Sequence, residues 1–175
     1  MKQEAIVLAR KLDKDLMTVA LTSPLKSAAV GAKAITADEI NTAMLLFGDE
    51  QDTEEMSAIL VHSLVAGRFY NMTEFVGAGR TDTVAGNGIV SNGVIGYFRG
   101  IPVIMSYKGT YDSVKAECIT LIIKKDVLAY MEKRTMDVVE EREEKLHCSD
   151  IVGAYTYAVA LINDAGVVVV RKTIV

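Results

Sequence analysis

The chain has 175 residues, a formal net charge of −4 and a sequence pI near 5.2. One domain or two small lobes of this length bury roughly 70% of the surface that the unfolded chain exposes, so a core can form without disulfides or metals. The acidic balance argues against a protein whose main partner is nucleic acid, because such proteins usually carry a clustered basic face. Half of the residues are hydrophobic but only 6% are aromatic, which favours helices packed on sheets over aromatic binding platforms.

The two cysteines, Cys118 and Cys148, lack the spacing of a CxxC motif. Because the sequence shows no signal peptide, we expect both thiols to be reduced in a cytoplasmic protein. No apolar run reaches the 18 or so residues that a membrane-spanning helix needs. The sequence therefore predicts a soluble chain with reduced cysteines.

The first predicted element is an amphipathic helix over residues 4–23. Its apolar stripe follows steps of three and four residues, and consists of Ala5, Leu8, Leu12, Leu16 and Val19. Ser23 and Pro24 end the helix, because the residue before a proline is pushed out of the helical region.

A second helix is predicted from residue 37. Thr36 is the expected N-cap and Glu39 follows three residues later, which is the spacing of a capping box. Ile40, Met44 and Phe47 form the expected buried face. The acidic segment 48–55 that follows lacks the alternating oxygen ligands and mid-loop glycine of a calcium loop, so we interpret it as a solvated loop.

Residues 58–62 form a short apolar run that predicts a buried strand, and Ser63 is expected to cap the helix that follows. His62 has no nucleophile placed beside it by the sequence, so we expect a structural histidine. The segment 77–93 is dense in Gly, Asn, Asp, Ser and Thr, and it lacks the third glycine of a GxGxxG phosphate loop. A mobile loop is therefore expected there.

Strands are predicted at 94–98, 101–106 and 116–123, with a turn at Arg99 and Gly100. Pro102 cannot donate a hydrogen bond, which places it at a strand start or on an edge strand. For residues 124–134 we expect a turn or short helix that leads into a charged strand, TMDVVEEREEK. The C-terminal segment is expected to form a hairpin, in which residues 153–163 pair with 167–175 and pack on the N-terminal helices. The expected fold class is α+β.

The order of these segments resembles the major capsid proteins of tailed bacteriophages, the Hong Kong 97-type fold that encapsulins share. The segments that carry the resemblance are KLDKDLMTVALTS, ITADEINTAMLLFGD, AILVHSLVAGRFYNM, RGIPVIMS, MDVVEEREE and the apolar C-terminal segment. The resemblance implies a peripheral (P) lobe from residues 1–57 and 136–175, and a mixed-sheet axial (A) lobe from 58–135. Family members carry an N-terminal arm and an extended loop before the long helix, and nothing before Lys2 supplies either. We therefore expect a truncated chain or a degenerate prophage gene.

The resemblance implies a structural subunit of a phage or prophage capsid, which self-assembles into capsomers of an icosahedral shell around DNA held non-specifically. It also implies a location in the capsid of the virion, after assembly in the bacterial cytoplasm. For a chain without the arm and loop, we expect monomers or small rings and no closed shells. An encapsulin-like shell is the alternative, and a small α+β enzyme is a weaker one, because no carboxylate lies in an apolar setting that would raise its pKa.

We expect no catalytic, cofactor or metal site. The mixed-sign run EEREEK either faces neighbouring subunits or forms a solvated strand face. The candidate subunit-interface residues are Arg80, Asp82, Asp137, Glu140, Glu141, Arg142 and Glu143.

Overall fold

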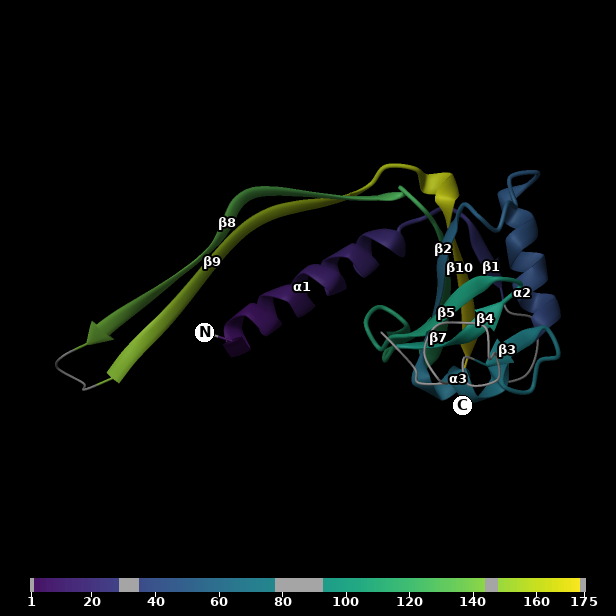
Figure 1. The fold of residues 1–175 in the computed structure, drawn as a ribbon, viewed down its shortest axis with the longest axis horizontal. Helices are drawn as coiled ribbons and strands as arrows, with labels where there is room; N and C mark the ends of the chain where they lie inside the picture. The colour runs from purple at the N-terminus through teal and green to yellow at the C-terminus, as the bar shows by residue number, and fades with distance from the viewer. Residues whose placement is uncertain (1, 29–34, 78–92, 144–147, 174–175) are drawn as a thin grey trace.

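The computed structural model describes residues 2–28, 35–77, 93–143 and 148–173. These residues form a body built on a mixed sheet, and a long two-stranded arm that extends from one end of the body beside a helix (Figure 1). The body contains both hydrophobic core clusters. The two parts are connected by the chain segments on either side of the arm and by the end of the helix.

The body sheet has eight strands in the order β1-β10-β7-β2-β5-β4-β3, and β6 pairs with β7 outside this path. Two pairs, β1 with β10 and β2 with β5, are parallel, and all others are antiparallel. The strands are β1 (Lys26–Ala28), β2 (Met56–Val61), β3 (Phe75–Gly77), β4 (Val94–Phe98), β5 (Ile101–Met105), β6 (Tyr111–Asp112), β7 (Glu117–Lys124) and β10 (Val167–Thr173).

Both faces of the sheet's centre are covered. Residues of β7 and β10 alternate between the two clusters: Ile122 and Val168 belong to the first, whereas Leu121 and Val169 belong to the second. The first cluster includes side chains of α2 (Ala37–Met44), the 3-10 turn η1 (Leu45–Phe47) and α3 (Ser63–Phe69). The second is closed by the C-terminal end of α1 (Lys2–Ala20), whose last residue Ala20 is fully buried.

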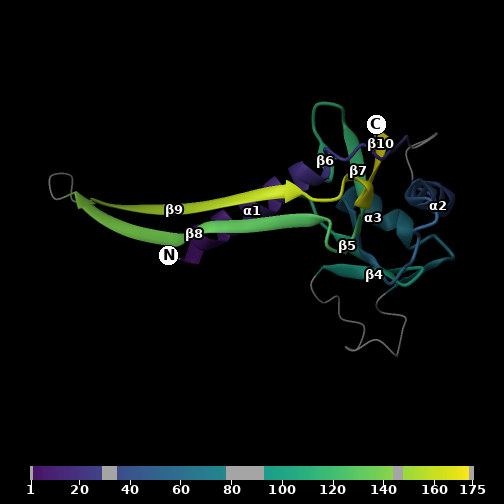
Figure 2. The same ribbon diagram turned by 90° about the horizontal axis from the view of Figure 1, so that it is seen from above.

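The arm consists of β8 (Leu128–Glu143) and β9 (Cys148–Leu161), which pair antiparallel along their length. Seen from above, α1 runs along the half of the arm that lies nearer the body (Figure 2). A turn at Lys125 and Asp126 leads from β7 into β8, and Asp126 has a φ of +56°. Of the two alternatives for this segment, the turn is therefore correct and the short helix is wrong.

The predicted C-terminal hairpin is wrong. β9 pairs with β8, and β10 enters the body sheet between β7 and β1 after the 3-10 turn η2 (Asp164–Gly166). The physical reason lies in the run Val167–Val170, whose four side chains are all buried. A continuous apolar run is typical of a strand covered on both faces, whereas a hairpin outside the body would leave one face in water.

Two local predictions about helix starts have different outcomes. Thr36 and Glu39 form the predicted capping box, and Ile40, Met44 and Phe47 are buried as expected. The cap of α3 is His62 and not Ser63: Nδ1 of His62 accepts a hydrogen bond from the backbone N–H of Leu64 at 3.2 Å. This bond confirms a structural role for the histidine.

The strands 94–98 and 101–105 are confirmed, and positive φ values at Arg99 (+50°) and Gly100 (+85°) form the turn between them. An edge position for Pro102 is wrong, because β5 lies between β2 and β4. Its place at a strand start is right. Pairing with β2 begins at Val103, one residue later, so the missing N–H interrupts no bond to β2.

No helix within the described ranges is both long enough and apolar enough to cross a membrane.

Candidate assembly surface

Five of the seven candidate interface residues lie on one strand of the arm. Asp137, Glu140, Glu141, Arg142 and Glu143 belong to the end of β8 that is remote from the body. Asp137 is exposed and pairs with Arg134 at 3.1 Å, while Glu140 and Arg142 are exposed. Arg80 and Asp82 lie outside the described residues, as does most of the loop 77–93 for which mobility is expected.

The arm has an inner face toward α1 and an outer face toward solvent. Along β9, the odd residues from Tyr155 to Leu161 are half-buried, whereas the even residues from 152 to 160 are exposed. Because side chains alternate between the faces of a strand, the register assigns the β8 partners to the same faces. The outer face includes Met131, opposite Ala158, and Val139, opposite Val152. Met131 is 71% exposed and each valine 56%.

Helix α1 covers the inner face of the arm with its apolar stripe. A Cβ atom on Gly153 of β9 would lie 3.6 Å from Cδ1 of Leu8, so the helix approaches the strand closely at this point. A shallow groove of about 280 Å³ follows the contact. Its lining residues are Ala5, Leu8, Ala9, Leu12, Glu132, Thr135 and Tyr155. The stripe predicted from the sequence therefore packs on the arm and not on the body sheet, apart from its C-terminal end.

A polar contact fixes the helix to the arm in the C-terminal half of α1. The hydroxyl of Tyr157 donates to Oδ2 of Asp15 at 2.6 Å, and Nζ of Lys11 lies 2.7 Å from Oδ1 of the same carboxylate. Lys11 and then Tyr157 lower the pKa of Asp15 below its ordinary value. The bond to Asp15 raises the pKa of Tyr157 to about 12, because ionisation would place two negative charges side by side.

Two further tyrosines join this contact. The Tyr155 ring lies 5.0 Å from that of Tyr157, centroid to centroid, and the Tyr130 ring lies 6.4 Å from it. The hydroxyls of Tyr130 and Tyr155 are hydrogen-bonded to each other, and Tyr130 also donates to Glu132 at 3.1 Å. This tyrosine cluster gives the inner face an aromatic layer with its polar ends satisfied.

The junction between arm and body is held by Ser23, which is fully buried. Its hydroxyl lies 2.6 Å from the carbonyl oxygen of Val167 and 3.0 Å from that of Asp164, and it accepts from the N–H of Leu25 at 3.2 Å. One side chain therefore connects the segment after α1 to the segment after β9. Gly166 packs closely on Val127 at the same junction, where a Cβ atom would overlap the valine side chain.

A second contact joins α1 to the body. Nζ of Lys108, in the loop after β5, is paired with Asp13 of the helix. Gly109 in the same loop has a φ of +68°, and a Cβ there would lie 2.6 Å from Cβ of Met17. The backbone can approach the helix this closely only because the residue is a glycine. These contacts fix the direction of α1 relative to the body.

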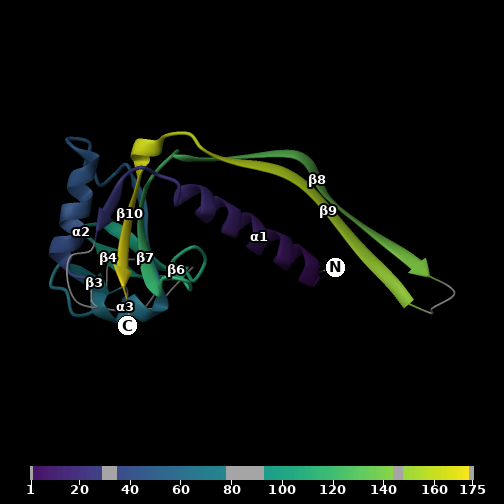
Figure 3. The same cartoon turned by 180° about the vertical axis from the view of Figure 1, so that it is seen from behind.

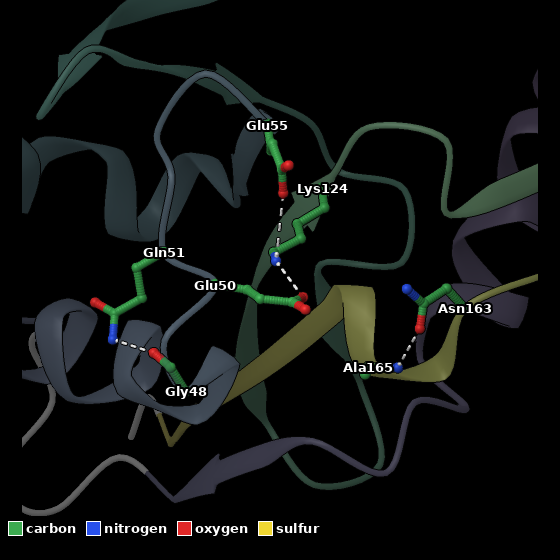
Figure 4. Close-up of polar contacts among 7 residues, drawn as sticks. All are labelled: Gly48, Glu50, Gln51, Glu55, Lys124, Asn163 and Ala165. Carbon is green, nitrogen blue, oxygen red and sulfur yellow. Dashed lines mark hydrogen bonds and ion pairs between the residues drawn. The ribbon is translucent and has the colours of Figure 1, made fainter.

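A buried cation lies at the end of the body near the arm. The side chain of Lys124 is 8% exposed and lies between Glu50, at 3.3 Å, and Glu55, at 3.8 Å (Figure 4). Its Nζ also lies 5.1 Å from the centroid of the Phe47 ring. Two carboxylates and an aromatic face compensate the cost of removing this charge from water. The acidic segment 48–55 thus contributes counter-ions to Lys124.

His62 and Cys118 are two potentially reactive side chains in the described ranges, and both are partly or fully buried. Burial lowers the pKa of His62 and raises the pKa of Cys118. The His62 ring lies 5.3 Å from that of Tyr111. A search of these ranges finds no group of three or more His, Cys, Asp or Glu side chains that could hold a metal ion. The arrangement provides a long arm with an exposed outer face, and α1 packs on its other face.

No protein-family model matches the sequence, and no curated protein matches it either. Solved structures do share its fold. A chain from Mycobacterium phage Che8 superposes with a TM-score of 0.66 at 17% identity, over 97% of this chain and 61% of the phage chain. The holo-SrpI encapsulin complex from Synechococcus elongatus PCC 7942 gives a TM-score of 0.68 at 14% identity, over 98% and 64% of the two chains. The capsid structure of the cyanophage P-SCSP1u gives 0.64 at 11% identity, over 100% and 66%.

These superpositions include nearly the whole chain, arm and body together, so the fold is α+β of the Hong Kong 97 capsid type, as the sequence predicts. The chain spans 61% to 66% of the lengths of the three structures. Sequence reasoning missed the link between Tyr157 and Asp15, which are 142 positions apart. The alternation of Tyr155, Tyr157, Val159 and Leu161 on one face supported packing on the N-terminal helices, and β9 does pack on α1. It did not identify Asp15 as the hydrogen-bond partner.

Proposed function

We propose that this chain is a shell-forming structural subunit that self-associates through its arm, in a phage or prophage capsid. The observation that carries the proposal is the arm itself. It projects from a body with its own core, keeps an exposed outer face, and superposes on shell proteins together with the body. Two-stranded hairpins are marginal on their own in water. An arm of this length therefore suits a surface that neighbours cover after assembly.

Within this proposal, α1 and the arm form the peripheral lobe and the body sheet forms the axial lobe. The boundaries expected from the sequence, 1–57 with 136–175 and 58–135, assign β10 and α2 to the peripheral lobe. The pairing of β10 between β7 and β1 favours moving it to the axial lobe, and α2 follows because Ile40 and Met44 pack in the same core cluster as Val168.

The candidate residues from Asp137 to Glu143 are then contact residues of the peripheral lobe, and Arg80 and Asp82 belong to an axial loop. DNA enclosed by such a shell would be held without sequence preference, because a subunit with a net charge of −4 repels phosphates. The virion would be the final location and the bacterial cytoplasm the site of assembly. The role requires no catalysis and no cofactor.

An encapsulin-like shell is the second candidate, favoured by the superposition on the encapsulin chain at a TM-score of 0.68. The difference lies in the contents, which are cargo protein in one case and DNA in the other. Purification of assemblies from the native host, followed by nuclease treatment and mass spectrometry of the contents, separates the two.

The test of self-association uses an arm-shortened variant as its control. Val138 and Gly153 are directly paired, so replacing residues 139–152 with Asn-Gly closes the hairpin by a two-residue turn. We expect light scattering and negative-stain images to show small rings that form as the concentration of the intact chain rises, and monomers of the same thermal stability for the shortened one. An intact chain that stays monomeric at every concentration contradicts the proposal.

A further inference from the structure

The end of the arm extends beyond the N-terminal end of α1 (Figure 3). We call residues 137–143 of β8 and 148–154 of β9, which pair with each other, the distal arm. Its outer face has an exposed apolar pair, Val139 and Val152. Asp137 and Glu140 of the same strand are also exposed. The segment 137–143 favours a cationic partner, because its carboxylates outnumber its cations. Residues 137–143 contain four carboxylates and one guanidinium, a net charge of −3.

The outer face of α1 has the complementary pattern. Ile6 and Val7, exposed by 49% and 61%, lie on the side of the helix away from Leu8, which packs on the arm. Arg10 and Lys14 follow Val7 at spacings of three and four residues, so they share its face, and both are exposed. The other charges of this helical segment are already engaged, Lys11 with Asp15 and Asp13 with Lys108.

We propose that the distal arm of one copy docks on the outer face of α1 of a second copy. Val139 and Val152 then meet Ile6 and Val7, and the acidic segment 137–143 meets the cations of the helix. The spacings agree: four strand residues from Val139 to Glu143 span ~13 Å, and seven helix residues from Val7 to Lys14 span ~10 Å. The arm cannot reach the outer face of its own α1, because it covers the opposite side of that helix.

This contact joins two different surfaces, so a pair of copies joined by it still has one free arm and one free helix face. Such heterologous contacts propagate into rings or open chains, whereas contacts between identical surfaces stop at a dimer. The inference rests on the proposed self-association and specifies its geometry. One arm tip covers little area compared with the 1,200–2,000 Å² of a typical stable interface, so each contact is weak and association rises steeply with concentration.

Crosslinking between differently tagged variants tests the contact. Val7→Cys and Val139→Cys are made separately in a Cys148→Ser background, which leaves only the buried Cys118, and are mixed in a glutathione redox buffer. We expect a disulfide-linked heterodimer in the mixture and little homodimer of either variant alone. The matched control replaces Val7→Cys by Val114→Cys, at a body position that is 92% exposed, and should give no product above background.

Charge exchange tests the same contact in solution. Arg10→Glu with Lys14→Glu, or Glu141→Lys with Glu143→Lys, should each weaken association about tenfold or more, and the four changes together should restore it. Lys26→Glu with Lys115→Glu, on the body, should leave the association constant within about twofold.

The outcomes separate this inference from the proposed function. Assembly without the Val7–Val139 crosslink and without rescue overturns the inference but leaves the proposed function standing. Efficient homodimers of Val139→Cys alone also overturn it, in favour of arm-to-arm contacts. A chain that never associates contradicts both.

Discussion

The body and the arm are stabilised in different ways. At the centre of the body, Leu121 and Ile122 are fully buried on opposite faces of one strand. In the arm, one face packs on α1 and the other exposes Met131, Val139 and Val152. The body can therefore fold by burial of its own side chains, whereas within the chain the arm packs on a single helix. This contrast predicts that mutations in the body change folding and mutations in the outer arm change association.

The largest effect is expected in the body core. Ile59 is fully buried in β2, so Ile59→Ala should lower the free energy of unfolding by about 2–5 kcal/mol, through lost burial and the cavity that remains. Val139→Ala, on the exposed arm, should change it by less than about 0.5 kcal/mol. Urea unfolding followed by circular dichroism measures both. Equal losses for the two variants would break the distinction between body and arm.

A smaller effect is expected at the junction. Ser23→Ala removes the hydroxyl that bonds to the carbonyls of Val167 and Asp164, and should cost about 1–3 kcal/mol, because buried polar groups lose their partner. The matched control is Thr22→Ala, whose exposed hydroxyl bonds only within its own turn, to Val19. If both variants unfold at the same urea concentration as the parent, the junction does not depend on Ser23.

The smallest effect concerns the bond between Tyr157 and Asp15. The raised pKa of Tyr157, about 12, means that this bond stabilises helix docking below the unfolded pKa near 10 and is lost as the pH rises from 10 through 12. For Asp15 the pKa is lowered, so its contribution is present above the unfolded pKa near 3.9 and is lost as the pH falls through the lower folded value.

Near-ultraviolet absorbance titration measures this bond directly. The difference between the intact chain and Tyr157→Phe gives the ionisation midpoint of Tyr157. Asp15→Asn should lower that midpoint toward 10, whereas Asp13→Asn, which removes the partner of Lys108, should leave it unchanged. A midpoint near 10 in the intact chain would mean that α1 is not held on the arm in solution.

Local signals in the sequence were sufficient for elements whose stability is local. The apolar residues of the α1 stripe follow one another at steps of three and four, and Thr36 and Glu39 of the capping box are three positions apart. Each motif is therefore recognisable from its local spacing. The strand pair at 94–105 is likewise specified by its turn at Arg99 and Gly100. The α+β class and the capsid-type fold follow from the order of such elements.

Pairing between distant segments could not be predicted in the same way. The apolar run at Val167–Val170 indicates a buried strand, but nothing local says that its partners are β7 and β1 and not β9. The side-chain bonds of Ser23 and of Tyr157 join residues more than 140 positions apart. For the candidate interface, the sequence correctly predicted that the charged segment is a strand, which is the distal part of β8. Its contact with a neighbouring copy stays a prediction.

Amide hydrogen exchange at low and high protein concentration tests the central claim most directly. We expect amides of β2, β7 and β10 to exchange slowly at both concentrations, because they lie in the covered centre of the sheet. Amides of the distal arm, 137–143 and 148–154, should exchange fast in the dilute monomer and become protected as copies associate. Full protection of the distal arm in the monomer, or no change when the chain assembles, would contradict the assignment of the arm as the association surface.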